Sequence, residues 1–241
     1  KEPNTAKISV WNLSETKRKA LEDREDGVPI ELSAGLGGES FLLFKGLLDV
    51  ALSERDGASW ITNIYTDDGK DALKRRAAVS YRGGVNVSKL VQDLSKEIGV
   101  GVGNLLEVIK SKGSVAEIGS AIAGGFAAKG GPGDALFGIL DDLGIDASIQ
   151  DGEIQAVASG QPIDPVAVLL KPTTGLKGTP AVDRKGRLEA SAALIPRLVP
   201  GAAVQIESIT ANGLWKVDVV SYTGDTASTD WTADIEGVPL Q

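Results

Sequence analysis

The sequence predicts a mainly β protein with an α/β insertion, in which two β sections bracket an α/β section. In residues 165–241, turn signals separate short apolar runs at a spacing of roughly 8–12 residues, which is typical of small barrels and sandwiches. Residues 1–82 also have the pattern of strands, whereas apolar residues in 83–164 recur at helical spacing. The middle section carries 5 basic and 11 acidic side chains, a net charge of −6, against −1 for each flanking section. We therefore expect domain boundaries near residues 82 and 164.

The first section, residues 1–82, contains one clear hairpin. Apolar runs at 40–55 and 59–66 flank an Asp-Gly pair, Asp56-Gly57, which is a strong hairpin signal. Further strands are expected in 6–14, in 27–38 before a glycine-rich turn, and in 77–84. Alternation divides the second run into two faces, Trp60, Thr62 and Ile64 on one and Ile61, Asn63 and Tyr65 on the other.

A short helix is expected at residues 67–77, between this hairpin and the next strand. Asp67 or Asp68 is a suitable N-cap, because a carboxylate accepts hydrogen bonds from the first backbone amides of a helix. Three cations stand near its C-terminal end, where the helix dipole favours them: Lys74, Arg75 and Arg76.

The middle section, residues 83–164, predicts two helices and a hairpin. The first helix follows Ser88, a candidate cap, and stops at Gly99. The second starts at Pro132 and stops at Gly144. Asp151-Gly152 then joins two alternating strands. The glycines and small residues between the helices, in 111–131, fit a mobile or partner-dependent segment.

The last section, residues 165–241, predicts strands that begin with an apolar run ended by Pro172. The stretch after it, "TTGLKGTP", raises the question of phosphate binding. A phosphate loop has four residues between its glycines and then Lys and Ser or Thr. Here only two residues separate Gly175 and Gly178, and Lys177 is one of them, so a loop between strands is expected. Likewise, the glycines in 99–104 follow a helix and predict a helix end and a turn.

Composition excludes several kinds of chemistry. The chain has no Cys and no His, which removes thiolate chemistry, the commonest general base and the commonest metal ligand. No apolar run approaches the roughly 18 residues of a membrane helix, and the polar start is unlike a signal peptide. Since the start also lacks Met, a few residues are expected to be missing or trimmed. We predict no catalytic, cofactor-binding or metal-binding residues, no cofactor and no membrane binding.

Acidic clusters and tryptophans have ordinary structural interpretations. The acids in 21–26 and 141–153 do not fit a calcium loop, and a solvated face or turn chemistry explains them. The four tryptophans are expected to be core or interface anchors: Trp11, Trp60, Trp215 and Trp231.

The pattern of strands and turns resembles the baseplate hub proteins of long-tailed bacteriophages, contractile or siphophage-type. The resemblance rests on "LLKPTTGLKGTP", "IPRLVPGAAVQIES" and "WKVDVVSYTGDT…DWTADIEG" in the last third. Upstream, "VWNLSE", "IELSAGLGG", "LLFKGLLDVALSERDGASWITNIYTDDG" and "ASIQDGEIQ" also fit. The segment around "SKGSVAEIGSAIAGG" matches least.

The resemblance implies a homotrimer in which each subunit gives two small β-barrels, residues 1–82 and 165–241, and a lateral α/β domain, residues 83–164. The ring would adapt the sixfold tail tube to the threefold spike or fibre and leave a channel through which DNA passes as cargo. Its implied partners are other copies of itself, a tail tube or distal tail protein, and a spike or tail-tip protein. A tape measure protein is a further candidate. The implied place is the virion baseplate, after synthesis in the cytoplasm of the bacterial host.

Three other functions stay open. A distal tail or other tail-tip protein would be hexameric. A carbohydrate-active or lytic enzyme would need two carboxylates roughly 5–10 Å apart in a cleft. A host-binding module would show an exposed aromatic patch beside unpaired strand edges. The residues Lys171, Thr173, Thr174 and Lys177 are expected to serve a subunit contact or the channel wall.

Overall fold

The fold is taken from a computed structural model and consists of two compact units. One unit comprises Lys1–Ala34 with Leu42–Ala156, and the other comprises Gly35–Phe41 with Val157–Gln241. The residues that the structure describes are 4–24, 28–35, 38–69, 79–81, 83, 86–112, 126–128, 131–228 and 230–240. Three hydrophobic clusters lie within them, one in each of the sections expected from the sequence.

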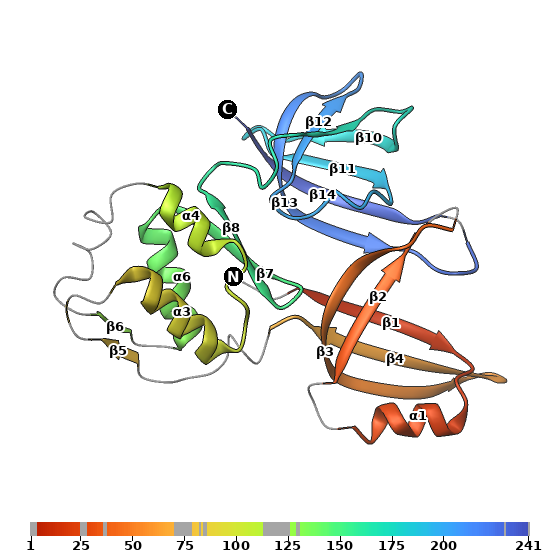
Figure 1. The fold of residues 1–241 in the computed structure, drawn as a ribbon. Coiled ribbons are helices and arrows are strands. Elements are labelled where there is room, and N and C mark those ends of the chain that lie inside the picture. The colour runs from red at the N-terminus through yellow and green to blue at the C-terminus, as the bar shows by residue number, and fades with distance from the viewer. Residues whose placement is uncertain are drawn as a thin grey trace. The chain divides into compact units, whose positions relative to one another are not determined.

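The first sheet has four strands in the order β1-β4-β3-β2, and it is open (Figure 1). Its strands are β1 (Thr5–Trp11), β2 (Pro29–Ala34), β3 (Phe41–Asp56) and β4 (Ser59–Asp67). The predicted hairpin is confirmed: Asp56 pairs with Ser59, and Gly57 takes the left-handed conformation that the turn requires. The two predicted faces of β4 are also confirmed, since Thr62 and Ile64 are buried while Ile61 and Tyr65 are more exposed.

A helix that the sequence pattern did not indicate, α1 (Glu15–Glu22), packs on this sheet. Ser14 caps it by accepting a hydrogen bond from the amide of Lys17. Leu21 contacts the small apolar cluster of the sheet, and the guanidinium of Arg18 lies 4.0 Å from the ring centre of Trp60. Residues 13–22 hold few apolar side chains, so their helical period was too weak to detect.

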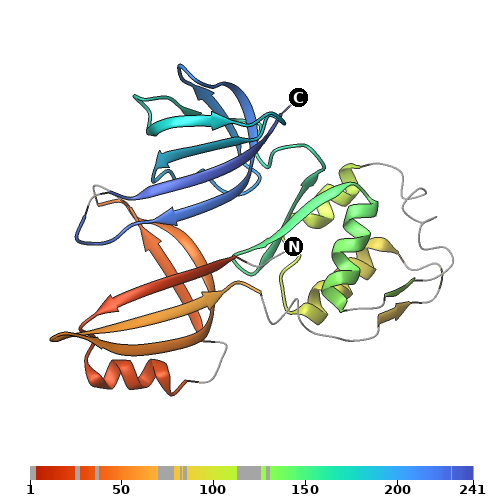
Figure 2. The ribbon, with the colours of Figure 1, turned by 180° about the vertical axis from the view of Figure 1, so that it is seen from behind.

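The α/β section is built from α3 (Val87–Ile98), α4 (Leu105–Ser111), α6 (Pro132–Asp142) and the hairpin of β7 (Ile145–Gln150) and β8 (Glu153–Ala158). Figure 2 shows these helices and this hairpin from behind. The apolar faces of α3 and α6 share one buried core with the hairpin. The short pair β5 (Val79–Tyr81) and β6 (Phe126–Ala128) completes the section. None of the helices among the described residues is long and apolar enough to cross a membrane.

Most local predictions for this section are confirmed, with one correction. Gly99 and Gly144 adopt the left-handed conformation at the two helix ends, and Asp151 and Gly152 both have positive φ, as a type I′ turn requires. The cap of α3 is Asn86, whose side chain accepts from the amide of Ser88, so the prediction of Ser88 as the cap was wrong. The predicted helix at 67–77 and the segment 111–131 lie largely outside the described residues.

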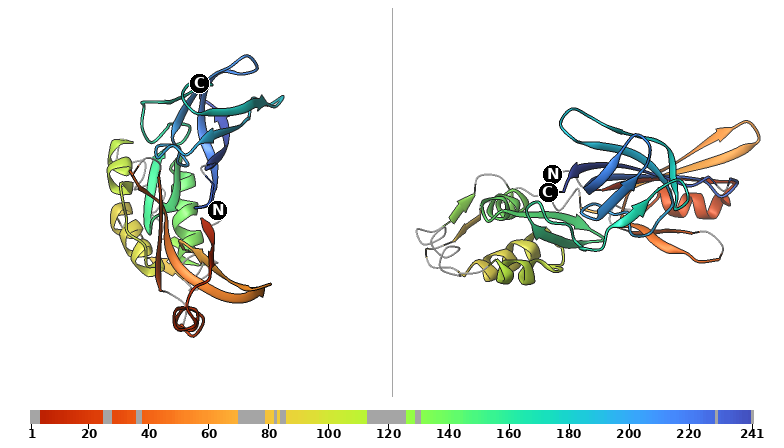
Figure 3. Two further views of the ribbon diagram at one scale, coloured as in Figure 1. Left: turned by 90° about the vertical axis from the view of Figure 1, so that its right-hand side faces the viewer. Right: turned by 90° about the horizontal axis from the view of Figure 1, so that it is seen from above.

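The second large sheet has six strands in the order β10-β11-β14-β13-β12-β9 and is curled into a half-barrel (Figure 3). Two side-chain hydrogen bonds stabilise the curled shape of the sheet. Thr210 donates to the backbone carbonyl of Pro180, and the indole N–H of Trp215 donates to the backbone carbonyl of Gly186. The buried side chains of all six strands fill its concave interior. The strands are β9 (Val168–Leu170), β10 (Leu176–Val182), β11 (Leu188–Ala193), β12 (Ala203–Glu207), β13 (Asn212–Thr223) and β14 (Thr232–Pro239).

Strand β10 corrects one prediction. The sequence predicted a loop over residues 173–180, after the strand that ends at Pro172, but residues 176–180 belong to a strand that is interrupted by a bulge between Lys177 and Ala181. Gly175 and Gly178 both have positive φ, a conformation that glycine adopts readily. Gly175 lies in the turn before β10, and Gly178 lies in the bulge. The mainly β prediction with helices in the middle section is thus confirmed, while the sheets are one curled half-barrel and open sheets.

Candidate functional site

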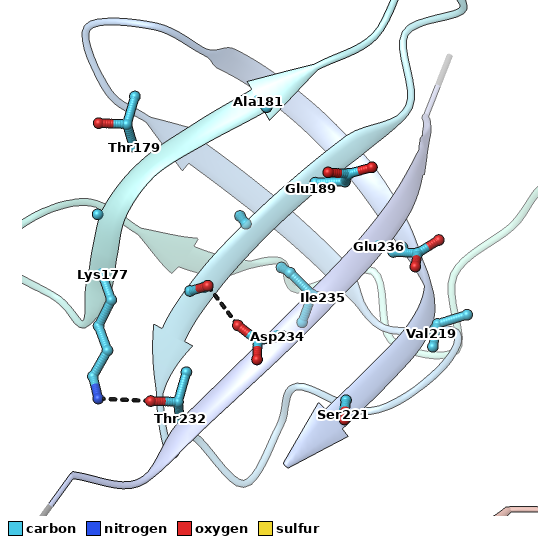
Figure 4. Close-up of a pocket in the computed structure, with 13 residues that line it drawn as sticks. Lys177, Thr179, Ala181, Glu189, Val219, Ser221, Thr232, Asp234, Ile235 and Glu236 are labelled. Carbon is cyan, nitrogen blue, oxygen red and sulfur yellow. Dashed lines mark hydrogen bonds between the residues drawn. The ribbon is translucent and has the colours of Figure 1, made fainter. Parts of the chain in front are cut away.

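A groove of about 670 Å³ lies on the outer face of the six-stranded sheet, across β10, β11, β14 and β13. Figure 4 shows the side chains that line it. Strand alternation explains its chemistry, because the residues between the buried positions of β11 and β14 must face outward. The outward residues are polar: Glu189, Ser191, Thr232, Asp234 and Glu236.

The strand register arranges the groove in two rows. In one row Glu189 lies opposite Glu236, which lies opposite Val219. In the next, Ser191 lies opposite Asp234 and donates its hydroxyl to the Asp234 carboxylate. The result is a shallow surface with three carboxylates from two adjacent strands.

The pair Glu189–Glu236 places two like charges directly across the strand pair, an arrangement that disfavours sheet formation. Arg187 relieves part of this repulsion, because its Nη2 lies 3.7 Å from Glu236 Oε2 and 3.4 Å from Asp218 Oδ2. These pairs are exposed, so each contributes less than about 1 kcal/mol to stability. The groove therefore keeps a negative surface that repels anions and favours cationic groups.

Lys177 closes one end of the groove. Its Nζ pairs with Asp230 and donates to the carbonyl of Trp231 at 2.9 Å and to Thr232 Oγ1 at 3.0 Å. Three acceptors thus fix the ammonium group against β14, as Figure 4 shows for Thr232. Lys177 fastens the edge strand β10 to the start of β14 and is not presented to an anion.

We predict that Lys177→Ala lowers the free energy of unfolding by less than about 1 kcal/mol, because the ion pair is near the surface. Nucleotide affinity should not change. Urea unfolding and a fluorescent-nucleotide titration measure the two quantities, with Lys185→Ala on the neighbouring turn as the matched control. A nucleotide that binds the wild type and is lost in the Lys177 variant would contradict this prediction.

The loop before β10 is held by its own residues. Thr174 Oγ1 donates to the carbonyl of Leu169 at 2.7 Å and accepts from the amide of Lys171. The amide of Thr174 in turn donates to the carbonyl of Lys171. These contacts make a compact turn, so the expected loop between strands is confirmed only for the residues before β10. Thr173 and Lys171 lie at its surface, where the predicted subunit contact or channel wall stays a prediction.

The predicted anchor tryptophans differ in burial, and the acidic residues have structural roles or lie at the surface. Trp215 is buried in the half-barrel, whereas Trp11 is 56% exposed, so it is not a core residue of its own chain. Asp151 serves the β7–β8 turn, as expected. Within the described residues, no cluster of three or more Asp and Glu side chains has an arrangement that could hold a metal ion.

Among the described residues, the carboxyl group whose pKa is raised most lies elsewhere, where the first sheet meets the β7–β8 hairpin. Asp68 is 7% exposed and accepts from the amide nitrogen of Asn4 at 2.8 Å and from its side-chain nitrogen at 2.6 Å. The same Asn4 side chain donates to the carbonyl of Ile149 at 3.0 Å. Burial raises the pKa of Asp68 to about 6, the nearby charges of Asp67 and Asp151 add to the rise, and the Asn4 hydrogen bonds oppose it.

The Asn4–Asp68 contact has a structural role, and neither residue lines the groove. A carboxylic acid with a pKa of about 6 is the kind of group that general acid catalysis uses, but here both oxygens are occupied by donors from Asn4. The prediction that Asp67 or Asp68 caps a helix falls at the edge of the described residues. The structure shows Asp68 joining the start of β1 to the end of β4.

Comparison with solved structures finds chains of the same fold. The 43 kDa tail protein of prophage MuSo2 from Shewanella oneidensis matches with a TM-score of 0.63 and 10% identity, over 98% of this chain and 89% of that one. A tail protein from Neisseria meningitidis MC58 matches with a TM-score of 0.63 and 10% identity, over 98% and 87%.

A third match is the E. coli c3393 protein, a component of the type VI secretion system described as structurally similar to the T4 bacteriophage tail proteins gp27 and gp5. Its TM-score is 0.60 at 10% identity, over 100% of this chain and 71% of that one. No protein-family model and no curated sequence matches the chain. The chain therefore has the fold of phage tail proteins and of a tail-like secretion component, in agreement with the baseplate hub resemblance of its sequence.

Proposed function

We propose that the chain is a structural protein of a phage tail baseplate, a homotrimeric hub ring that joins the sixfold tail tube to the threefold spike or fibre. The observation that carries this proposal is the fold match to two tail proteins over 98% of the chain. The half-barrel and the open first sheet would be completed as two small barrels within the ring, where neighbouring copies satisfy the sheet edges. The protein would reside in the virion tail.

The acidic groove supports a role beside a DNA channel. Glu189, Asp234 and Glu236 make this face of the sheet repel a phosphate backbone, and the chain as a whole carries a net charge of −8. DNA would then pass as cargo without being gripped. The tail tube or distal tail protein, the spike or tail-tip protein and the tape measure protein are the partners of this proposal.

Symmetry tests the proposal. The purified chain, measured by light scattering and averaged in electron micrographs, is expected to form a threefold ring. A sixfold ring would support the distal tail protein instead. A stable monomer at all concentrations would overturn the hub, because an adaptor between two symmetries requires several copies.

The type VI secretion system is a second candidate setting, favoured by the c3393 match over the whole of this chain. Antibody labelling distinguishes the two settings. Label at the tips of phage tails supports the baseplate, and label on the secretion apparatus supports the alternative.

The groove is where an enzymatic role is tested most directly, because Glu189 and Glu236 are cross-strand neighbours there. The Cβ atoms of cross-strand neighbours lie roughly 5 Å apart, so both carboxyl groups stand on one small area of the surface, as a glycosidase pair would require. We propose that they do not catalyse, since the matched tail proteins supply a structural role for the whole fold. Hydrolysis of peptidoglycan by the wild type that is abolished in Glu189→Gln would contradict this view.

A further inference from the structure

The tip of the β12–β13 hairpin exposes an apolar side chain completely. Ile209 has a relative exposure of 104%, the largest among the exposed large apolar side chains of the described residues. Isoleucine is among the residues most often buried in proteins. A single exposed apolar side chain is ordinary by itself, so Ile209 matters here only together with a surface that complements it. Its immediate neighbours Ser208 and Thr210 are polar.

The tip is rigid, because its polar groups bond to one another. Ser208 Oγ donates to the carbonyl of Ala211 and accepts from its amide, both at 2.9 Å, and Asn212 Nδ2 donates to the carbonyl of Ser208 at 2.7 Å. Thr210 Oγ1 donates to Pro180 on β10 at 2.9 Å. Ile209 is therefore held outward by a fixed loop, so little conformational entropy is lost when it docks.

The outer face of the first sheet carries several exposed apolar side chains. Along β3, Leu47, Val50 and Leu52 are 46%, 41% and 57% exposed, although their inward neighbours Leu48 and Ala51 are buried. The bulge between Leu48 and Val50 keeps all three side chains on one face. The register places Tyr65 of β4 beside Val50, and Trp11 of β1 lies on the same face.

Charge complements the apolar match. Glu207 ends β12 beside the tip and is exposed, and among the described residues its carboxylate accepts a side-chain hydrogen bond from Gln205. On the outer face of the first sheet, Lys7 lies in the row with Tyr65 and Val50, and its Nζ is 5.6 Å from the Tyr65 ring centre. Glu207 and Lys7 thus carry opposite charges next to the apolar side chains of their respective surfaces.

We propose that the Ile209 tip of one copy docks on the β3 face of a second copy of this chain, with Glu207 of one facing Lys7 of the other. The two surfaces differ, so the contact is heterologous and repeats from copy to copy, as a ring requires. This inference rests on the proposed function, for which it names the subunit contact. An unrelated tail protein on either surface is the competing outcome.

The test compares assembly of the full chain and its variants by sedimentation velocity over a range of concentrations. Ile209→Asp is expected to weaken association by about tenfold or more, as for an apolar anchor at an interface. Val166→Asp, at a position 60% exposed and outside both surfaces, is the matched control and should assemble like the wild type. Circular dichroism verifies that each variant is folded.

A charge exchange then tests the pairing itself. Glu207→Lys and Lys7→Glu should each weaken assembly, and the double variant should restore it, an outcome that no partner of a different sequence can produce. Wild-type trimers that survive Ile209→Asp unchanged, or a double variant that assembles no better than the singles, overturn this inference and leave the hub proposal standing. A wild type that remains monomeric overturns both.

Discussion

Leu188→Ala is expected to lower the free energy of unfolding of the C-terminal unit by about 2–5 kcal/mol. Leu188 has no exposed surface and lies in the cluster that fills the half-barrel, together with Trp215 and Ile235. Removing three carbon atoms from a closed core loses their transfer free energy and leaves a cavity. Urea unfolding followed by tryptophan fluorescence measures the loss, since Trp215 belongs to the same cluster.

The effect should be confined to one unit. Leu140→Ala removes an equally buried side chain from the separate core of the α/β section, which belongs to the other compact unit. The two costs should add in the double variant, because the residues share no cluster. Leu214→Ala, at a leucine of β13 that is 42% exposed, is the control and should cost far less. Equal losses in Leu188→Ala and Leu214→Ala would contradict the assignment of the core.

Acidification from pH 7 to pH 4 is expected to relieve a destabilising contribution from Asp68. Its pKa is about 6 in the folded chain against an ordinary value of 3.8, so the folded state binds more protons between these values. Stability from this group is therefore highest below pH 3.8, falls as the pH rises to about 6, and is constant above. At 1.36 kcal/mol per pH unit the difference corresponds to at most about 3 kcal/mol.

Asp68→Asn isolates this contribution, because the amide does not titrate. The stability of the variant relative to the wild type should rise between pH 4 and pH 7, as measured by urea unfolding at several pH values. Asn4→Ala provides the matched comparison, because it removes the side-chain donor to Asp68. The pKa of Asp68 should then rise further, so the loss of stability should extend to higher pH than in the wild type. Parallel profiles for wild type and Asp68→Asn would contradict the assignment.

Local sequence patterns were sufficient where a short stretch determines its own conformation. Asp56-Gly57 and Asp151-Gly152 predicted their hairpins, because tight turns depend on backbone conformations that few residues adopt. Gly99 and Gly144 predicted helix ends for the same reason. The short helix α1 was missed, since its stability comes from Ser14 and from packing on the sheet more than from its period.

The groove could be predicted only in part. Alternation in 188–193 and 232–239 shows that Glu189 and Ser191 share a face, as do Asp234 and Glu236. Which strand lies beside which is a matter of non-local pairing, so the opposition of Glu189 and Glu236 is invisible in one sequence. The role of Lys177 could not be predicted for the same reason, since its hydrogen-bond partners lie more than fifty residues away in the sequence.

The sequence by itself determined the class of the protein: β sections around an acidic α/β section, without Cys or His and with strand patterns that resemble a baseplate hub. Those properties depend on composition and on periods of two to four residues. Only the tertiary structure decided that Asn4 meets Asp68 and Ile149, that three carboxylates gather on one sheet, and that Ile209 stands fully exposed. These contacts and exposures depend on the register of the strands and on the curl of the sheet. Residues far apart in the sequence determine both, because they pack into the same hydrophobic cores.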